Sequence, residues 1–131
     1  MRLLLDSHVF VWAKLAPEKL RHTARAAIFN PDNDVFVSVA TAWELWVKHA
    51  KRPIASILDG GPSAFLSAVA ESGIAMLDIA LGHAAVAADL PLRHRDPFDR
   101  MLIAQAIVER LTLVTADPVV AAYEGFDVLP C

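Results

Sequence analysis

The sequence predicts an α/β protein in which helices cover both faces of a central, mainly parallel sheet. Short apolar runs alternate with segments of helical periodicity along the whole chain. The apolar runs show no regular polar alternation, which is typical of strands buried on both faces. The 131 residues, of which 56% are hydrophobic and 21% charged, fit one compact domain, residues 1–131, with its own core.

The order of these patterns gives the expected elements. Strands are expected at Arg2–Leu5, Asp34–Ser38, 74–79, Leu111–Asp117 and 126–130. Helices are expected at 8–15, Glu18–Asn30, 39–52, Pro62–Ser72, 80–90, Pro97–Arg110 and 118–123. Ser38 suits the N-cap of the third helix, and Gly73 suits the end of the fourth.

The composition argues against several classes of protein. The only cysteine, Cys131, excludes an internal disulfide and a thiolate zinc site, and it is consistent with a cytoplasmic location. We expect neither a membrane span nor a signal peptide, because no apolar run is long enough and no small-residue cleavage site follows the first one. The net charge of -3 gives no overall attraction to nucleic acid, so binding would require a local basic patch or a bound cation.

Acidic side chains follow the predicted strands or lie on the helices beside them. Asp6 ends the first strand and Asp117 ends "LTLVTAD", while Asp99 lies in the first turn of the preceding helix. Glu44 lies two turns into the helix after Ser38. Ligands of parallel sheets bind at the carboxyl ends of the strands, so we expect these carboxylates to gather at one edge.

Each carboxylate also has a purely structural explanation. Asp6 and Asp117 could cap the helices that follow them, and Asp96 before a proline is a typical N-cap. Asp99 then falls at a helix position where a carboxylate faces the dipole favourably. Glu44 lies among apolar neighbours, so it must either pair with Lys48, four residues on, or open onto a cleft.

Together, these carboxylates favour a bound cation. Like charges at one edge destabilise a fold unless a cation lies among them, and oxygen ligands suit Mg²⁺ or Mn²⁺ better than zinc. The histidines form no zinc-binding pattern. We interpret most of them as ordinary surface or core residues.

Four segments in this order resemble the PIN-domain ribonucleases: "LLLDSHVFVW", "VATAWEL", "HRDPFDRMLIAQA" and "LVTAD". They are most similar to the VapC-type toxins of bacterial toxin–antitoxin pairs, and the similarity spans nearly the whole chain. The resemblance implies a three-layer α/β/α sandwich and Mg²⁺- or Mn²⁺-dependent cleavage of RNA phosphodiester bonds. It also implies a cognate antitoxin and a homodimer as partners.

The resemblance assigns the four catalytic, metal-binding acids to Asp6, Glu44, Asp99 and Asp117. Asp99 matches because "DRMLIAQA" follows the family pattern, which leaves Asp96 as a cap and at most a supporting group. Ser7 and Thr115 match small hydroxyl positions that line family sites. The fourth acid varies in the family, and Asp117 fills its position here.

Two further surfaces are suggested by the sequence. Basic side chains near Asp99 are candidates for contacting the RNA backbone: the three arginines Arg93, Arg95 and Arg100, and His94 between them. Further candidates are Lys14, Lys48, Lys51 and Arg52. Any large apolar side chain that the core leaves exposed would suit an antitoxin groove or a dimer face, the candidates being Trp12, Trp43, Trp46 and Phe65.

The remaining alternative is a PIN-like domain with a weak or inactive site that acts only as a binding or scaffold module. Other α/β classes lack their motifs here. The second aspartate of a haloacid-dehalogenase-type phosphatase is absent from "DSHV", and no glycine-rich loop follows the first strand. A receiver domain would need a lysine after a late strand, and "LTLVTADP" has none.

Overall fold

The computed structural model describes residues 1–131 and contains one five-stranded, all-parallel sheet with the strand order β3-β2-β1-β4-β5. The strands are β1 (Arg2–Leu5), β2 (Asp34–Ser38), β3 (Ile74–Leu77), β4 (Thr112–Thr115) and β5 (Asp127–Pro130). The α-helices are α1 (Ser7–Leu15), α2 (His22–Ile28), α3 (Val39–Lys51), α4 (Gly61–Glu71), α5 (Leu81–Asp89), α6 (Pro97–Glu109) and α7 (Pro118–Ala121). Two short 3-10 helices lie at Pro17–Lys19 and Ser56–Leu58.

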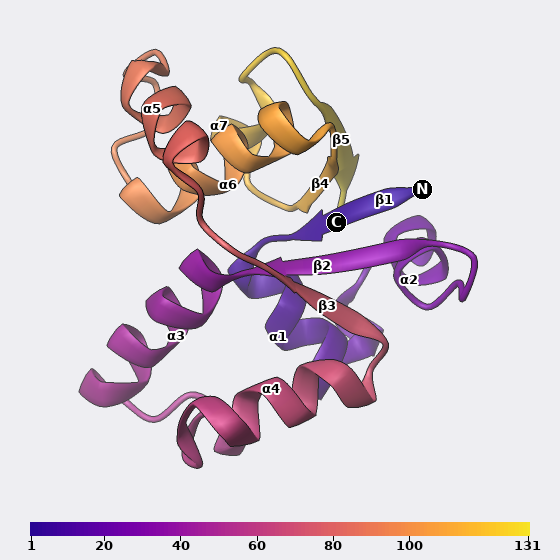
Figure 1. Ribbon diagram of the computed structural model, residues 1–131. Helices are drawn as coiled ribbons and strands as arrows, with labels where there is room; N and C mark the ends of the chain where they lie inside the picture. The colour runs from indigo at the N-terminus through magenta and orange to yellow at the C-terminus, as the bar shows by residue number, and fades with distance from the viewer.

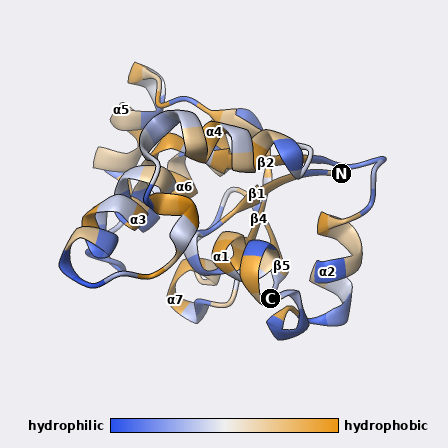
Figure 2. Ribbon diagram, turned by 90° about the horizontal axis from the view of Figure 1, so that it is seen from below, coloured by the Kyte–Doolittle hydropathy of each residue, from blue (hydrophilic) through white to orange (hydrophobic).

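The helices form two layers around the sheet, which confirms the predicted sandwich (Figure 1). Neighbouring side chains of a strand point to opposite faces, so Leu3 and Leu5 pack with the α1–α4 layer. Leu4 packs with α6 and α7 on the other face. The central strands are therefore apolar and lie in the middle of the molecule, as the hydropathy colouring shows (Figure 2).

The chain order creates a switch point at the centre of the sheet. From β1 the chain adds β2 and β3 on one side, and β4 and β5 then pair on the other side of β1. The connections after β1 and β4 therefore leave the carboxyl edge of the sheet in different directions. Ligands of open parallel sheets bind at the point where these two connections diverge. Asp6 follows β1 and Asp117 follows β4 at this point.

The helix predicted at Glu18–Asn30 is wrong in extent. Pro17 begins a 3-10 turn, and the backbone is extended at Leu20 before α2 begins at His22. At this break Leu20 buries its side chain in the core, which stabilises the extended course of the chain there. The end of α4 is as predicted: Gly73 has a φ of 70°, which few other residues adopt, and it follows the C-cap Ser72.

No helix of the structure is long and apolar enough to span a membrane. Three of the four large aromatic side chains singled out in the sequence contribute to the core. Phe65 is fully buried, and Trp12 and Trp46 pack against the same cluster. Only Trp43 is left with most of its surface, 60%, exposed.

Candidate active site

Asp6 lies at the junction between the central strand and the first helix. It is 8% exposed, and its Oδ1 accepts a hydrogen bond of 2.8 Å from the backbone N–H of Val9, which makes it the N-cap of α1. Burial raises the pKa of Asp6, and the nearby Thr115 hydroxyl and the Val9 N–H offset part of this. Asp6 is therefore a cap, and it also lies in the acidic cluster at the carboxyl edge.

Glu44 is buried on α3 and has two partners. It is 4% exposed, its Oε1 accepts a short hydrogen bond from the Ser7 hydroxyl, and its Oε2 accepts one of 2.9 Å from Lys48 Nζ. The bond to Glu44 raises the pKa of Lys48. The sequence left two possibilities for Glu44, a pair with Lys48 or a position at a cleft. In the structure Glu44 does both, because it bonds Lys48 and also lines a groove.

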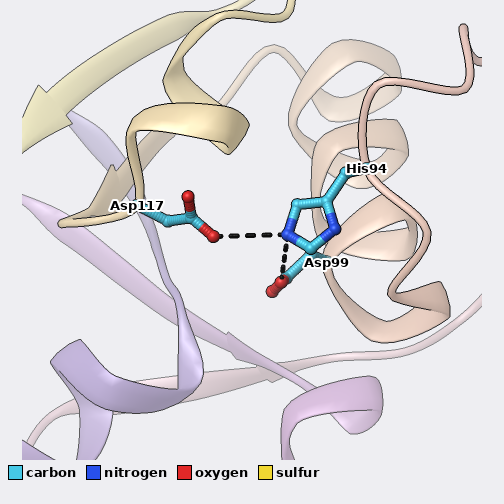
Figure 3. Close-up of side chains that lie close together, drawn as sticks. All are labelled: His94, Asp99 and Asp117. Carbon is cyan, nitrogen blue, oxygen red and sulfur yellow. Dashed lines mark hydrogen bonds and ion pairs between the residues drawn. The ribbon is translucent and has the colours of Figure 1, made fainter.

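Asp99 and Asp117 meet at the side chain of His94 (Figure 3). The imidazole Nε2 lies 2.9 Å from Oδ2 of Asp99 and 3.2 Å from Oδ2 of Asp117. Asp117 also caps α7, since its Oδ1 accepts from the Val119 N–H at 2.8 Å. Asp117 therefore uses one oxygen for the helix and directs the other into the site.

The hydrogen bonds of His94 indicate its tautomer. Its Nδ1 accepts a hydrogen bond of 3.2 Å from the backbone N–H of Asp96, so the ring proton lies on Nε2. Nε2 therefore donates to both Asp99 and Asp117, and its lone pair is not available to an ion in this arrangement. His94 holds two carboxylates together, which the sequence analysis missed. The only available signal was its place in "HRDPFDR", two residues before Asp96.

Asp96 has the structural role predicted for it. Its Oδ1 accepts from the backbone N–H of Phe98 at 2.9 Å and so caps α6, with Pro97 in the first turn. Its charge still acts on the site, because Asp96 and Glu44 both raise the pKa of Asp99. Burial is the largest cause of this shift, which brings the pKa of Asp99 to about 6, while His94 opposes it. Asp99 thus lies in a region of excess negative charge.

The donor atoms of this edge suit a hard divalent cation. The carboxylate oxygens that Asp99 and Asp117 direct toward His94 lie within 4.8 Å of each other, and the charges of Asp6 and Glu44 act directly on Asp99. Carboxylate oxygens are the ligands that Mg²⁺ and Mn²⁺ prefer. The positive charge of such an ion would offset the repulsion that raises the pKa of Asp99.

The three arginines near the site differ in their contacts. The Arg100 guanidinium donates to the carbonyl oxygens of Ala87, Leu90, Pro91 and His94, so it stabilises the end of α5 and the loop before α6. Arg93 Nη1 donates to the Ala122 carbonyl at 2.9 Å. Arg95 is exposed, and its side chain makes no hydrogen bond or ion pair.

Comparison with known families identifies the class of protein. The family model described as "PIN domain" matches residues 3–125, so the chain belongs to the PIN-domain family. No curated protein matches the sequence significantly.

Solved structures with a similar fold include chains of toxin–antitoxin complexes. The chain is similar to one in VapBC2 from Rickettsia felis bound to a promoter DNA fragment, with a TM-score of 0.72, 15% identity and coverage of 99% of this chain and 98% of that one. It is also similar to one in DNA-bound VapBC from Salmonella typhimurium, with a TM-score of 0.71, 16% identity and coverage of 99% and 98%. A toxin–antitoxin complex from Klebsiella pneumoniae gives a TM-score of 0.61, 21% identity and coverage of 97% and 95%.

Proposed function

We propose that this PIN-domain protein is a Mg²⁺- or Mn²⁺-dependent endoribonuclease that hydrolyses RNA phosphodiester bonds. The observation that carries the proposal is the meeting of four acids from separate segments at one sheet edge, namely Asp6, Glu44, Asp99 and Asp117. Helix capping explains Asp6 and Asp117 in part, but it explains neither the burial of Glu44 nor the raised pKa of Asp99.

A divalent ion held by these carboxylates would lower the pKa of a water nucleophile and neutralise charge on the scissile phosphate. The protein's own groups prepare the ligands for this role. Ser7 and Lys48 fix both oxygens of Glu44, and His94 fixes Asp99 relative to Asp117. Ligands fixed in this way lose little conformational freedom when the cation and the substrate bind.

We further propose that the nuclease is the toxin of a type II toxin–antitoxin pair, with a cognate antitoxin and a second copy of the chain as protein partners. The similar folds in VapBC complexes support this proposal. An antitoxin that places a cationic side chain at the acidic edge would compete with both the ion and the RNA.

Cleavage of labelled RNAs by the purified protein tests the proposal. The assay compares Mg²⁺, Mn²⁺ and chelator, and it includes Asp99→Asn beside Asp127→Asn, the same chemical change at the opposite end of the sheet. We expect metal-dependent cleavage that Asp99→Asn loses and Asp127→Asn keeps. Equal cleavage by all three proteins would indicate either a contaminant or that Asp99 is not part of the site. Absence of cleavage on varied RNAs, with no co-purified inhibitor, would favour a binding module.

A further inference from the structure

A groove leads away from the acidic edge between α3 and the start of α6. Its volume is about 480 Å³, and its lining includes Glu44, Lys48, Lys51, Arg95 and Phe98. Glu44, Lys48 and Lys51 follow each other at helical spacing, so they line one side of α3 from the acids to the helix end. Lys48 and Lys51 also border a second hollow of about 480 Å³ with Arg52, which extends the groove beyond the end of α3.

The cations of this groove are available to a ligand. Lys51, Arg52 and Arg95 are exposed, and their side chains take part in no hydrogen bond or ion pair. Arg93 and Arg100, by contrast, donate to backbone carbonyls. A local basic strip thus lies beside an acidic site on a chain with a net charge of -3.

An aromatic pair lies at the same groove. Trp43 is 60% exposed, and its ring contacts that of Phe98 edge to face with 5.0 Å between the centroids. Phe98 lines the groove itself. Exposed aromatic rings beside a row of cations are the combination that binds single-stranded nucleic acid, because bases stack on the rings while the cations contact phosphates.

We infer that single-stranded RNA runs along this groove as it leaves the acidic site, with its phosphates on Lys51, Arg52 and Arg95 and a base on Trp43. This inference rests on the proposed nuclease function and assigns a path to its substrate. A second copy of the chain could also cover Trp43, but it would not need the unpaired cations along the rest of the groove.

Binding of a fluorescently labelled single-stranded RNA, followed by anisotropy at several salt concentrations, tests this path. Asp99→Asn serves as the common background so that the RNA stays intact. The test variants are Lys51→Glu/Arg95→Glu and Trp43→Ala. The control is Lys19→Glu/Arg25→Glu, which makes the same change in charge at exposed positions on the 3-10 helix Pro17–Lys19 and on α2, neither of which lines the groove. Figure 1 shows α2 and α3 on opposite sides of the view.

We expect Lys51→Glu/Arg95→Glu to weaken binding about tenfold or more, and to reduce the slope of log affinity against log salt by roughly 0.7 for each lost phosphate contact. Trp43→Ala should weaken binding about tenfold without this change of slope. The control should stay within about twofold of the background protein.

Two results would overturn the inference. One is binding by the groove variants that equals the control. The other is a change from dimer to monomer in Trp43→Ala, measured as molar mass by light scattering, with unchanged RNA affinity. This result would show that the surface around Trp43 binds a second copy of the chain. Cleavage in the otherwise wild-type background separates the two proposals. If the wild-type protein cleaves RNA with metal and the groove variants bind RNA normally, only the proposed RNA path is contradicted. If the wild-type protein cleaves no RNA, the proposed nuclease function is contradicted.

Discussion

The acidic edge has a buried half and an open half, and they are built differently. Asp6, Ser7 and Glu44 come from the first turn of α1 and from the body of α3 and are 8%, 5% and 4% exposed. The side chains of His94, Asp99 and Asp117 are 18%, 20% and 37% exposed. The buried half is held by helices packed on the core, whereas His94 in the open half belongs to the loop between α5 and α6.

Each half neutralises its charge with a cation or donor of its own. Lys48 and the Ser7 hydroxyl donate to Glu44, and the imidazole N–H of His94 donates to Asp99 and Asp117. The open half still keeps an excess of negative charge: after burial, the charges of Asp96 and Glu44 are the main causes that raise the pKa of Asp99 to about 6. The difference suggests that the buried half provides fixed geometry and the open half provides most of the attraction for a cation.

The largest expected effect tests whether both halves serve one function. Glu44→Gln keeps the shape of the buried side chain and an acceptor for Ser7, but it removes the charge. We expect RNA cleavage to fall more than about 100-fold, because supporting groups alone account for roughly 10–100-fold losses and Glu44 is proposed as a ligand. Initial rates with Mn²⁺ measure this. A loss below about tenfold would place Glu44 outside the reaction.

The next effect concerns stability in the buried half. Lys48→Met removes the cation and leaves the buried Glu44 with Ser7 as its hydrogen-bonding partner. Breaking a fully buried pair costs about 3–5 kcal/mol, but the Lys48 side chain is 49% exposed, so we expect a loss of about 1–2 kcal/mol. Urea unfolding without metal measures it, with Lys51→Met as the control. Equal midpoints for the two variants would contradict the role of Lys48.

A third effect concerns the loop that carries His94. The Tyr123 hydroxyl donates to the Pro91 carbonyl at 2.6 Å and accepts from the backbone N–H groups of Arg93 and His94 at 3.1 and 2.8 Å. Tyr123→Phe removes these bonds with almost no change in shape. We expect a loss of about 1–3 kcal/mol in the free energy of unfolding and roughly tenfold slower cleavage.

Thermal unfolding and cleavage rates of Tyr123→Phe check this effect. Addition of Mn²⁺ should restore part of the stability, because ligand binding favours the folded state. A variant as active and as stable as the wild type would show that the loop does not depend on this hydroxyl.

The smallest effect is a pH dependence of the metal-free protein. The pKa of Asp99 is about 6 in the folded state and about 4 in the unfolded chain, so the folded state binds more protons between these values. The free energy of unfolding contributed by Asp99 therefore falls as pH rises from about 4 to about 6. Burial of Asp6 acts with the same sign.

Urea midpoints across this range, with chelator present, should decline less in Asp99→Asn than in the wild type, with Asp127→Asn as the control. Parallel curves for Asp99→Asn and the wild type would mean that burial and the neighbouring carboxylates do not raise the pKa of Asp99.

The sequence was informative about the fold and about the acids for the same physical reason. Continuous apolar runs predict buried parallel strands, and the carboxyl ends of such strands must meet, so Asp6 and Asp117 could be placed at one edge. Asp96 and Ser38 were also correctly predicted as caps, because capping depends on a few adjacent residues. The break at Leu20 was not predicted, since it follows from burial against distant parts of the core.

Long-range contacts explain what the sequence could not show. His94 bridges two acids, one five and the other 23 residues away, and only its place in "HRDPFDR" distinguishes it from the other histidines in the sequence. Arg100 was expected to contact RNA. In the structure its guanidinium donates to four carbonyl groups at the end of α5 and in the loop that follows, an arrangement that depends on the packing of α5 on α6.

Binding of Mn²⁺ by isothermal titration calorimetry, without RNA, tests the central claim most directly, namely that the two halves of the acidic edge form one cation site. The proteins are the wild type, Glu44→Gln from the buried half, Asp99→Asn from the open half, and Asp127→Asn as the control. The structure predicts that Asp127→Asn binds like the wild type while both site variants bind at least about tenfold more weakly. Undiminished Mn²⁺ binding by Glu44→Gln and Asp99→Asn would contradict the claim.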